Sequence, residues 1–196
     1  MNTPYLSFPP TEMMKVAYPD PESFYILWFQ QRDVPEQHLD ARTRQVFEKI
    51  FRRGQKPQGN RDSGAPPRAN PFLDLDSIEP QTESVLDETE LNAYTAAFER
   101  SGFFGPISWY RNIDQNRELV PGLGEQKLDL PALQVVAAWD AAIPPEGAEL
   151  SRAKCSDIEV YRIEECGHWT QQDKPEELSG IMVDWLTRRF GSDPQV

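Results

Sequence analysis

The sequence is poor in basic charge, in cysteine and in long apolar runs. Its 20 Lys and Arg residues against 32 Asp and Glu residues give a formal net charge of -12, which argues against a nucleic-acid partner, because such binding needs a basic face. Two cysteines are too few for a disulfide framework or a structural zinc site, and they favour a reduced, cytoplasmic setting. No run approaches the roughly 18 apolar residues of a membrane span, and the start at Met1 lacks the features of a signal peptide.

Histidine is also scarce, since the chain has only His38 and His168. His168 lies in the tight glycine turn of residues 166–169 (CGHW), a setting in which hydrolases present a general base. His38 lies near the polar start of a predicted helix and is interpreted as a surface residue. Neither G-x-S-x-G nor G-x-D-x-G occurs, so the sequence offers no nucleophile for such a base to serve. We therefore expect the chain to hold only part of an active site.

Three segments of different composition divide the chain. Residues 1–19 contain several prolines and are predicted to form an extended connector. Residues 20–120 carry helical patterns, interrupted over 55–70 by a stretch without periodic apolar positions, which predicts a mobile loop. Residues 121–196 combine two strand-like runs with a final amphipathic helix.

The middle segment is predicted to be mostly helical, apart from its loop. One helix is predicted to run unbroken over residues 35–53. Asp87 and Glu90 have capping-box spacing at the start of another. Pro106 is predicted to open the helix that follows, because proline is favoured at the first helical position.

The last segment is predicted to form an α/β arrangement. The apolar runs at residues 132–138 and 158–163 are typical of strands buried on both faces of a parallel sheet. A helix begins at Pro175, and its inward face is predicted to hold Leu178, Ile181, Met182, Trp185 and Leu186. Two buried parallel strands and one helix leave sheet edges unpaired, so we expect this segment to end a larger sheet, with the chain either incomplete or reliant on another chain.

Asp140 follows the first strand-like run and His168 follows the second. Because reactive groups in open α/β sheets sit at the carboxyl ends of strands, we expect these two side chains to be neighbours. A carboxylate there can accept the ring N–H of the histidine and leave the other nitrogen free as a base. In the alternative interpretation Asp140 caps a loop and His168 makes a structural hydrogen bond. Placement on successive strand ends favours the catalytic pair.

Tyr25 and Tyr110 each lie in a cluster of aromatic residues on separate predicted helices. By spacing alone they are interpreted as core aromatics. In the functional alternative, both hydroxyls point into one pocket and donate hydrogen bonds to an oxygen that gains negative charge. Composition does not choose between these two interpretations.

Two longer motifs carry a family resemblance. Residues 98–114 (FERSGFFGPISWYRNID) and 165–176 (ECGHWTQQDKPE) resemble the epoxide hydrolases of the α/β-hydrolase superfamily, and residues 2–4 and 24–30 are also similar to that family. The resemblance covers nearly the whole chain and is weakest over residues 52–80. It implies an incomplete α/β-hydrolase fold: a helical cap followed by the last two parallel strands and the final helix of the core.

Several site roles follow from this resemblance. Tyr25 and Tyr110 become the cap tyrosines that polarise an epoxide oxygen, while Asp140 and His168 become the charge partner and the water-activating base. The resemblance also points to Trp109, Trp169 and Phe29 as substrate-binding residues. In this family an aspartate on the nucleophile elbow opens the epoxide to a covalent ester, which activated water hydrolyses to a diol. That elbow precedes the cap in this family, and this chain starts after it.

The expected substrate is a small apolar epoxide, and no metal or organic cofactor is implied. Without the elbow aspartate we expect the chain alone to be inactive, and we expect its partner to be the missing N-terminal half or a second copy of itself. One alternative is a non-catalytic module that binds apolar ligands or a partner protein. Another is a related hydrolase, such as a dehalogenase or an esterase, against which the paired tyrosines argue.

Overall fold

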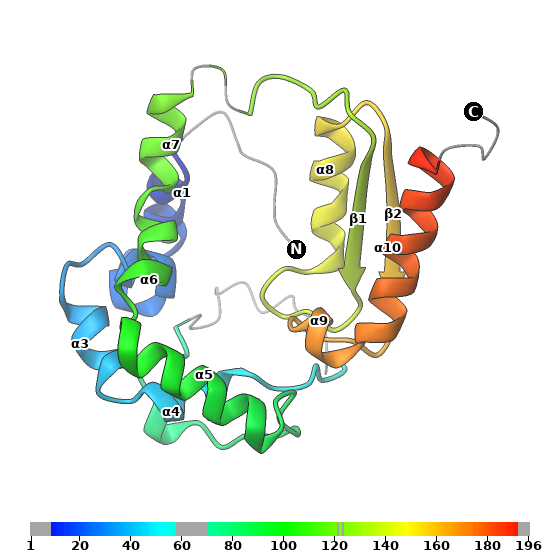
Figure 1. Cartoon of the computed structure of the whole chain (residues 1–196). Helices are drawn as coiled ribbons and strands as arrows, with labels where there is room; N and C mark the ends of the chain where they lie inside the picture. Colours follow the sequence, from blue (N-terminus) through cyan, green and yellow to red (C-terminus); the bar gives the residue numbers. More distant parts are fainter. Residues whose placement is uncertain (1–8, 58–69, 121, 123, 192–196) are drawn as a thin grey trace. The chain divides into compact units, whose positions relative to one another are not determined.

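The chain divides into two compact units in the computed structural model, which describes residues 9–57, 70–120, 122 and 124–191 (Figure 1). Unit 1 holds the described residues of 53–57 and 126–191. Unit 2 holds those of 9–52 and 70–125. Much of the predicted connector and most of the predicted loop, residues 1–8 and 58–69, lie outside the described residues.

Unit 2 is helical. Its described residues form α1 (Pro10–Ala17), α2 (Tyr25–Trp28), α3 (Val34–Asp40), α4 (Thr43–Ile50), α5 (Glu88–Ser101), α6 (Phe104–Arg111) and α7 (Ile113–Leu119), with short 3-10 turns at Pro21–Ser23 and Leu75–Ser77. Trp28, Leu39 and Ile107 lie at the centre of its core. His38 packs edge-on against Trp28, with ring centroids 5.6 Å apart, and is half-buried, so its interpretation as a surface residue is wrong.

Helix α1 occupies part of the segment for which the sequence predicts an extended connector, and that prediction is wrong for these residues. Pro10 stands at the first helical position, where a backbone N–H is not needed, and Pro19 lies beyond the last turn. The prolines therefore bound the helix instead of breaking it. The hydroxyl of Thr11 donates a hydrogen bond to Asp114 of α7 and ties the two helices together.

Two predicted helices are each divided in the structure. The predicted 35–53 helix becomes α3 and α4, because Arg42 between them leaves the helical region of backbone conformation, with φ -134° and ψ 27°. The helix predicted to open at Pro106 begins at Phe104 and gives way to α7 after Asn112. Apolar periodicity runs through both breaks, so the sequence pattern does not reveal them.

Helix α5 begins as predicted. The carboxylate of Asp87 accepts the N–H of Glu90 at 2.8 Å, and the carboxylate of Glu90 accepts the N–H of Asp87 at 2.9 Å. These reciprocal bonds satisfy amides that have no partner within the helix, and they confirm the capping box.

Unit 1 contains a parallel sheet of two strands, as predicted, but the prediction that both strands are buried on both faces is wrong, since only Val136, Ala137 and Ile163 at their carboxyl ends are buried. β1 (Ala132–Ala137) pairs with β2 (Ile158–Ile163), and the register places Ala137 opposite Ile163. The connection between them contains a 3-10 turn (Pro145–Gly147) and α8 (Ala148–Lys154), and α9 (Thr170–Asp173) and α10 (Pro175–Phe190) follow β2. Helices α8 and α10 lie on either side of the sheet (Figure 1).

The core of unit 1 is small. Ala137, Ile163 and Cys166 are fully buried, and α10 packs Leu178 and Ile181 against them. The prediction that all five apolar residues of α10 point inward is wrong for two of them, Met182 and Leu186, which are 46% and 48% exposed. A sheet of two strands covers one stripe of the helix and leaves the neighbouring positions uncovered. Among the described residues, every helix is too short or too polar to span a lipid bilayer.

Candidate active site

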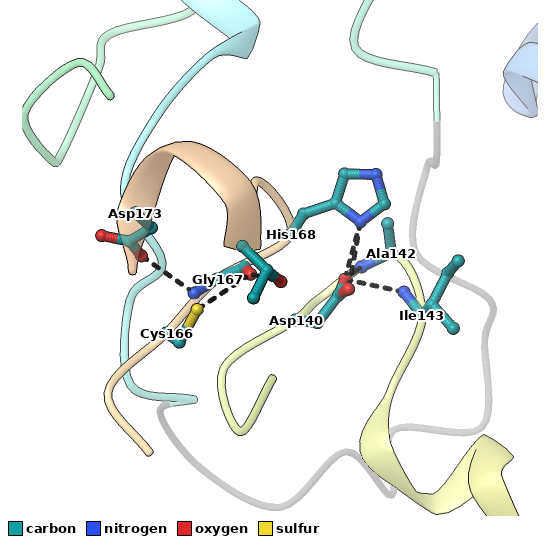
Figure 2. Close-up of polar contacts among 8 residues, drawn as sticks. Asp140, Ala142, Ile143, Cys166, Gly167, His168 and Asp173 are labelled. Carbon is teal, nitrogen blue, oxygen red and sulfur yellow. Dashed lines mark hydrogen bonds and ion pairs between the residues drawn. The ribbon is translucent and has the colours of Figure 1, made fainter. Parts of the chain in front are cut away.

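Asp140 and His168 meet at the carboxyl ends of the two strands, as the sequence predicts (Figure 2). The Nδ1 atom of His168 lies 3.1 Å from each carboxylate oxygen of Asp140. The backbone N–H groups of Ala142 and Ile143 donate to one of those oxygens, each at 2.8 Å. The side chain of Asp140 is fully buried, whereas that of His168 is 38% exposed. The acid is thus fixed in the interior, and the imidazole reaches the surface of the unit.

Asp140 is held as a carboxylate. Burial raises its pKa, but hydrogen bonds from His168 and from the backbone amides of Ile143 and Ala142 lower it, and the net pKa lies below the ordinary value for aspartate. An ionised carboxylate has no hydrogen to donate, so Nδ1 of His168 carries the hydrogen in this contact. In the neutral imidazole the lone pair then sits on Nε2, which is the atom available to accept a proton.

Backbone hydrogen bonds continue beyond the strands and align the two loops. The N–H of Ala138 donates to the carbonyl of Ile163, and the N–H of Trp139 donates to the carbonyl of Cys166, both at 2.9 Å. Between these two acceptors Glu165 adopts the left-handed conformation, with φ 50°, and begins the sharp turn that leads to His168. The pairing of the strands therefore extends to the residues next to the acid and the base.

Tyr25 and Tyr110 meet within unit 2. Tyr25 begins α2 and Tyr110 lies in the last turn of α6, and their rings form an edge-to-face pair with centroids 5.5 Å apart. Phe29 contacts both rings, at centroid distances of 5.6 and 5.3 Å. Phe72, which the sequence reasoning missed, packs against Tyr25 and Phe29 at 5.8 and 5.4 Å. The two tyrosines thus share one aromatic cluster, and both are half-buried.

The two phenols are also joined by a hydrogen bond. Burial raises the pKa of Tyr110, and this hydrogen bond with Tyr25 offsets part of the increase. A phenol whose pKa is raised stays protonated throughout the neutral range. It therefore keeps the O–H that an electrophilic, oxygen-polarising role needs.

Arg111 and Gln30 fasten α2 to α6, and the sequence reasoning missed both. Arg111 donates from Nε to the carbonyl of Phe29 at 2.7 Å, and it forks onto the carboxylate of Glu36, with these side chains 15% and 11% exposed. Gln30 donates to the carbonyl of Tyr110 at 3.1 Å. The hydrogen bond from Arg111 lowers the pKa of Glu36 despite its burial. The only sequence signal was the position of Arg111 directly after Tyr110.

The predicted substrate-binding residues lie in different environments. Phe29 is buried in the aromatic cluster, while Trp109 is 81% exposed on α6. Trp169 is half-buried, and its ring lies 5.0 Å from that of His168. Their roles stay predictions. Within the described residues, no three His, Cys, Asp or Glu side chains gather in a way that could hold a metal ion.

Comparison with known proteins gives relatives of one kind, although no protein-family profile matches the sequence. The chain is 30% identical to bifunctional epoxide hydrolase 2 of Sus scrofa, over 95% of this chain and 33% of that protein. Its fold is similar to that of an epoxide hydrolase from an endophytic Streptomyces, with a TM-score of 0.76 and 26% identity over 94% of this chain and 58% of the other. For epoxide hydrolase A of Mycobacterium thermoresistibile the TM-score is 0.73, with 27% identity over 94% and 59%.

These likenesses extend over nearly the whole chain but only part of each relative. The chain spans 33% of the length of the Sus scrofa protein and 58% and 59% of the two solved structures. Together with the helical unit and the parallel strands, the likenesses confirm the predicted fold class, a partial α/β-hydrolase fold.

Proposed function

We propose that this chain, which belongs to the epoxide hydrolases of the α/β-hydrolase superfamily, supplies the hydrolytic base and the oxygen-polarising phenols of an epoxide-opening site. The substrate is a small apolar epoxide and the product is a diol. The nucleophile is a carboxylate supplied from outside this chain, because the sequence holds no nucleophile-elbow motif.

In the first step the carboxylate attacks an epoxide carbon, and the bond from that carbon to the epoxide oxygen breaks. The product is an ester with a neighbouring alkoxide. Tyr25 and Tyr110 donate hydrogen bonds to this oxygen as it gains charge, and one phenol transfers its proton to it. The raised pKa of Tyr110 supports this role, since the phenol is protonated when the substrate arrives.

In the second step Nε2 of His168 takes a proton from water, and the resulting hydroxide adds to the ester carbonyl. The carbonyl carbon then releases the second diol oxygen, which takes up the proton from the imidazolium. The carboxylic acid left behind returns its proton to the phenolate. One epoxide and one water thus give one diol, and every protein group recovers its starting state.

The contact between the carboxylate of Asp140 and Nδ1 of His168 carries this proposal, because it meets two needs of a general base. The carboxylate fixes the tautomer of His168, and it stabilises the imidazolium that forms when water is deprotonated. The lowered pKa of Asp140 means that the carboxylate is present at neutral pH and is lost only as pH falls through that lowered value.

The decisive experiment restores the nucleophile. The chain is co-expressed with the N-terminal half of epoxide hydrolase A from Mycobacterium thermoresistibile, and diol formation from styrene oxide is measured. We expect His168→Gln to lower turnover by about a thousandfold while the ester still forms, which mass spectrometry detects as a covalent adduct. A Tyr25→Phe, Tyr110→Phe double variant should form neither ester nor diol, because the phenols act in the first step.

The other histidine provides a matched control. His38→Gln should retain turnover, since His38 packs against Trp28 in the core of unit 2. Unchanged diol formation in the His168→Gln pair would refute the assigned base. Turnover by the chain without any partner, if His168→Ala abolishes it, would refute the external nucleophile.

We also propose that the natural partner is the chain segment or separate chain that carries the nucleophile, rather than a second copy. In the described part of the sheet, β1 and β2 pair only with each other, whereas a parallel sheet of this kind needs further strands at its edges. Sedimentation of the chain alone and with the nucleophile-bearing half should give a monomer and a one-to-one complex. A stable homodimer of the chain alone would favour the second copy.

A non-catalytic apolar-ligand module is the second candidate, and the aromatic cluster around Tyr25 and Phe29 favours it. Saturable binding of styrene oxide without turnover, even in the co-expressed pair, would favour this module over the epoxide-opening function. We propose a cytoplasmic setting for either function, supported by Cys155 and Cys166, which are both free thiols. Fractionation of the native host cells checks this setting.

A further inference from the structure

The turn that presents His168 is anchored by a buried carboxylate outside the Asp140 contact. Asp173, at the end of α9, accepts the backbone N–H of Gly167 at 3.1 Å, as Figure 2 shows. Its side chain is only 2% exposed. Its other oxygen accepts a hydrogen bond from Nη1 of Arg53 at 2.8 Å. The buried charge thus has a guanidinium on one side and the glycine amide on the other.

The peptide groups of Gly167 are held at both ends. While Asp173 accepts its N–H, the hydroxyl of Thr170 donates to its carbonyl at 3.2 Å. Gly167 is the residue directly before His168, so the orientation of these peptide groups sets the direction in which the His168 side chain leaves the backbone.

A second contact holds the same turn from the side of Arg53. A Cβ atom built on Gly54 would overlap Cα of Gly167, and a Cβ built on Gly167 would overlap Cα of Gly54. Both positions therefore require glycine because the two backbones touch, rather than because of an unusual φ. Arg53 and Gly54 are consecutive, so the residue that pairs with Asp173 adjoins the residue that packs on the turn.

We propose that Asp173, paired with Arg53, is a positioning residue for His168: it fixes the Gly167 peptide so that Nδ1 stays within 3.1 Å of Asp140. This inference rests on the proposed role of His168 as the base. Without the carboxylate, the Gly167 N–H would lose its buried acceptor and the turn would relax, because a buried amide without a partner is unfavourable. The hydrogen of the imidazole would then no longer be confined to Nδ1.

The test measures the tautomer directly in the isolated chain. A long-range ¹H–¹⁵N spectrum distinguishes a histidine with the hydrogen on Nδ1 from one with it on Nε2. The chain has only two histidines, so His38→Gln assigns the signals. The second readout is the hydrogen exchange rate of the Gly167 amide.

We expect the Nδ1-protonated form of His168 in the native chain and a mixture of tautomers in Asp173→Ala, with Gly167 exchange faster by about tenfold or more. Asp173→Asn should lie between the native chain and Asp173→Ala in both readouts, since its amide oxygen still accepts the Gly167 N–H. Arg53→Lys should behave like the native chain, and Arg53→Gln should lie between Arg53→Lys and Asp173→Ala.

The matched control is Arg188→Gln, which removes exposed ion pairs with Glu159 and Asp184 on the same unit and leaves the turn untouched. Both readouts should stay native in this variant. A folded Asp173→Ala chain with the native tautomer and native Gly167 exchange overturns the proposal. Should Asp173→Ala fail to fold, the Arg53→Gln variant is measured instead, because the Arg53 side chain is half-exposed and its replacement disturbs the fold less. Native values of both readouts in Arg53→Gln then overturn the proposal.

The proposal and the proposed function fail separately. If the tautomer responds to Asp173 but the co-expressed pair shows no turnover that depends on His168, the assigned chemistry is wrong and the positioning stands. If turnover depends on His168 while the tautomer ignores Asp173, the positioning is wrong and the chemistry stands.

Discussion

In unit 1 the candidate base is directed by polar contacts, whereas in unit 2 the candidate phenols are placed by packed rings. His168 faces a carboxylate that also accepts two backbone amides. Tyr25 and Tyr110 instead contact each other and the ring of Phe29, and their helices are fastened by Arg111 from outside the cluster. A base needs one defined nitrogen free, which hydrogen bonds specify. A hydrogen bond from a phenol is stronger where water is partly excluded, and the packed aromatic rings exclude water.

The largest effect should come from the buried ion pair of unit 2. We expect Arg111→Ala to lower the free energy of unfolding by about 3–5 kcal/mol, because it leaves Glu36 as an uncompensated buried charge. Hydrogen exchange at the amides of α2 and α6 measures the loss. Arg44→Ala removes exposed ion pairs with Glu48 and Glu88 in the same unit and should change stability much less than Arg111→Ala, because exposed ion pairs contribute little. Equal losses in the two variants would contradict the assignment.

The next largest effect should be in unit 1. Asp140→Ala removes the acceptor of the Ala142 and Ile143 amides, and we expect it to destabilise β1 and β2 by about 2–3 kcal/mol. Exchange at the strand amides reports this loss. Asp129→Ala, which removes an exposed acceptor for Ser156, should have a much smaller effect. If Asp140→Ala were no more destabilising than this control, the polar contacts of Asp140 would not be what stabilises β1 and β2.

Tyr110→Phe should have a moderate effect that depends on pH. Loss of the hydrogen bond to Tyr25 should destabilise unit 2 by about 0.5–1.5 kcal/mol at neutral pH. Because burial raises the folded-state pKa of Tyr110, this group favours folding fully below the unfolded-state value of about 10, and that contribution is lost as pH rises through the folded-state pKa. Urea unfolding at neutral and alkaline pH should therefore show a weaker alkaline loss in Tyr110→Phe. The same alkaline loss in both chains would contradict the raised pKa.

Asp140 should give the opposite pH dependence, a loss of stability at acid pH. Its folded-state pKa is lowered, so the stability it contributes is present above the unfolded-state value of about 4 and is lost as pH falls through the folded-state pKa. We expect the acid-induced loss to be weaker in Asp140→Asn than in the native chain. An unchanged acid limb in this variant would contradict the lowered pKa.

The smallest effect is expected on the outer side of α10. Leu186→Ser should change the free energy of unfolding by less than about 0.5 kcal/mol, since Leu186 is half-exposed. Its neighbour Trp185 is buried, so Trp185→Ala should be several times more destabilising. Thermal melting compares the two. A large loss in Leu186→Ser would indicate that this side of the helix is covered after all.

The sequence predicts the parts of this chain that follow from a regular pattern. Asp140 and His168 could be paired because carboxyl ends of adjacent parallel strands meet at one edge, a rule that needs no coordinates. The capping box of α5 is likewise a local pattern. For Tyr25 and Tyr110, spacing predicted a core role and the resemblance predicted a functional one. The observed cluster is compatible with both.

What the sequence does not predict depends on contacts between distant residues or on local backbone geometry. Arg53 and Asp173 are 120 positions apart, so no periodicity connects them. The break at Arg42 leaves the apolar pattern intact. Met182 continues an apolar stripe, but whether such a residue is covered depends on the width of the sheet beneath it.

The register of β1 on β2 has a consequence for the chemistry of the chain. The acid and the base lie on loops that leave opposite residues, Ala137 and Ile163, so their alignment is inherited from the way the strands are matched. A slip of one residue would carry Asp140 about 3.3 Å along the strand axis, beyond the reach of the imidazole. The tautomer of His168 therefore also reports whether β1 and β2 have paired in the correct register.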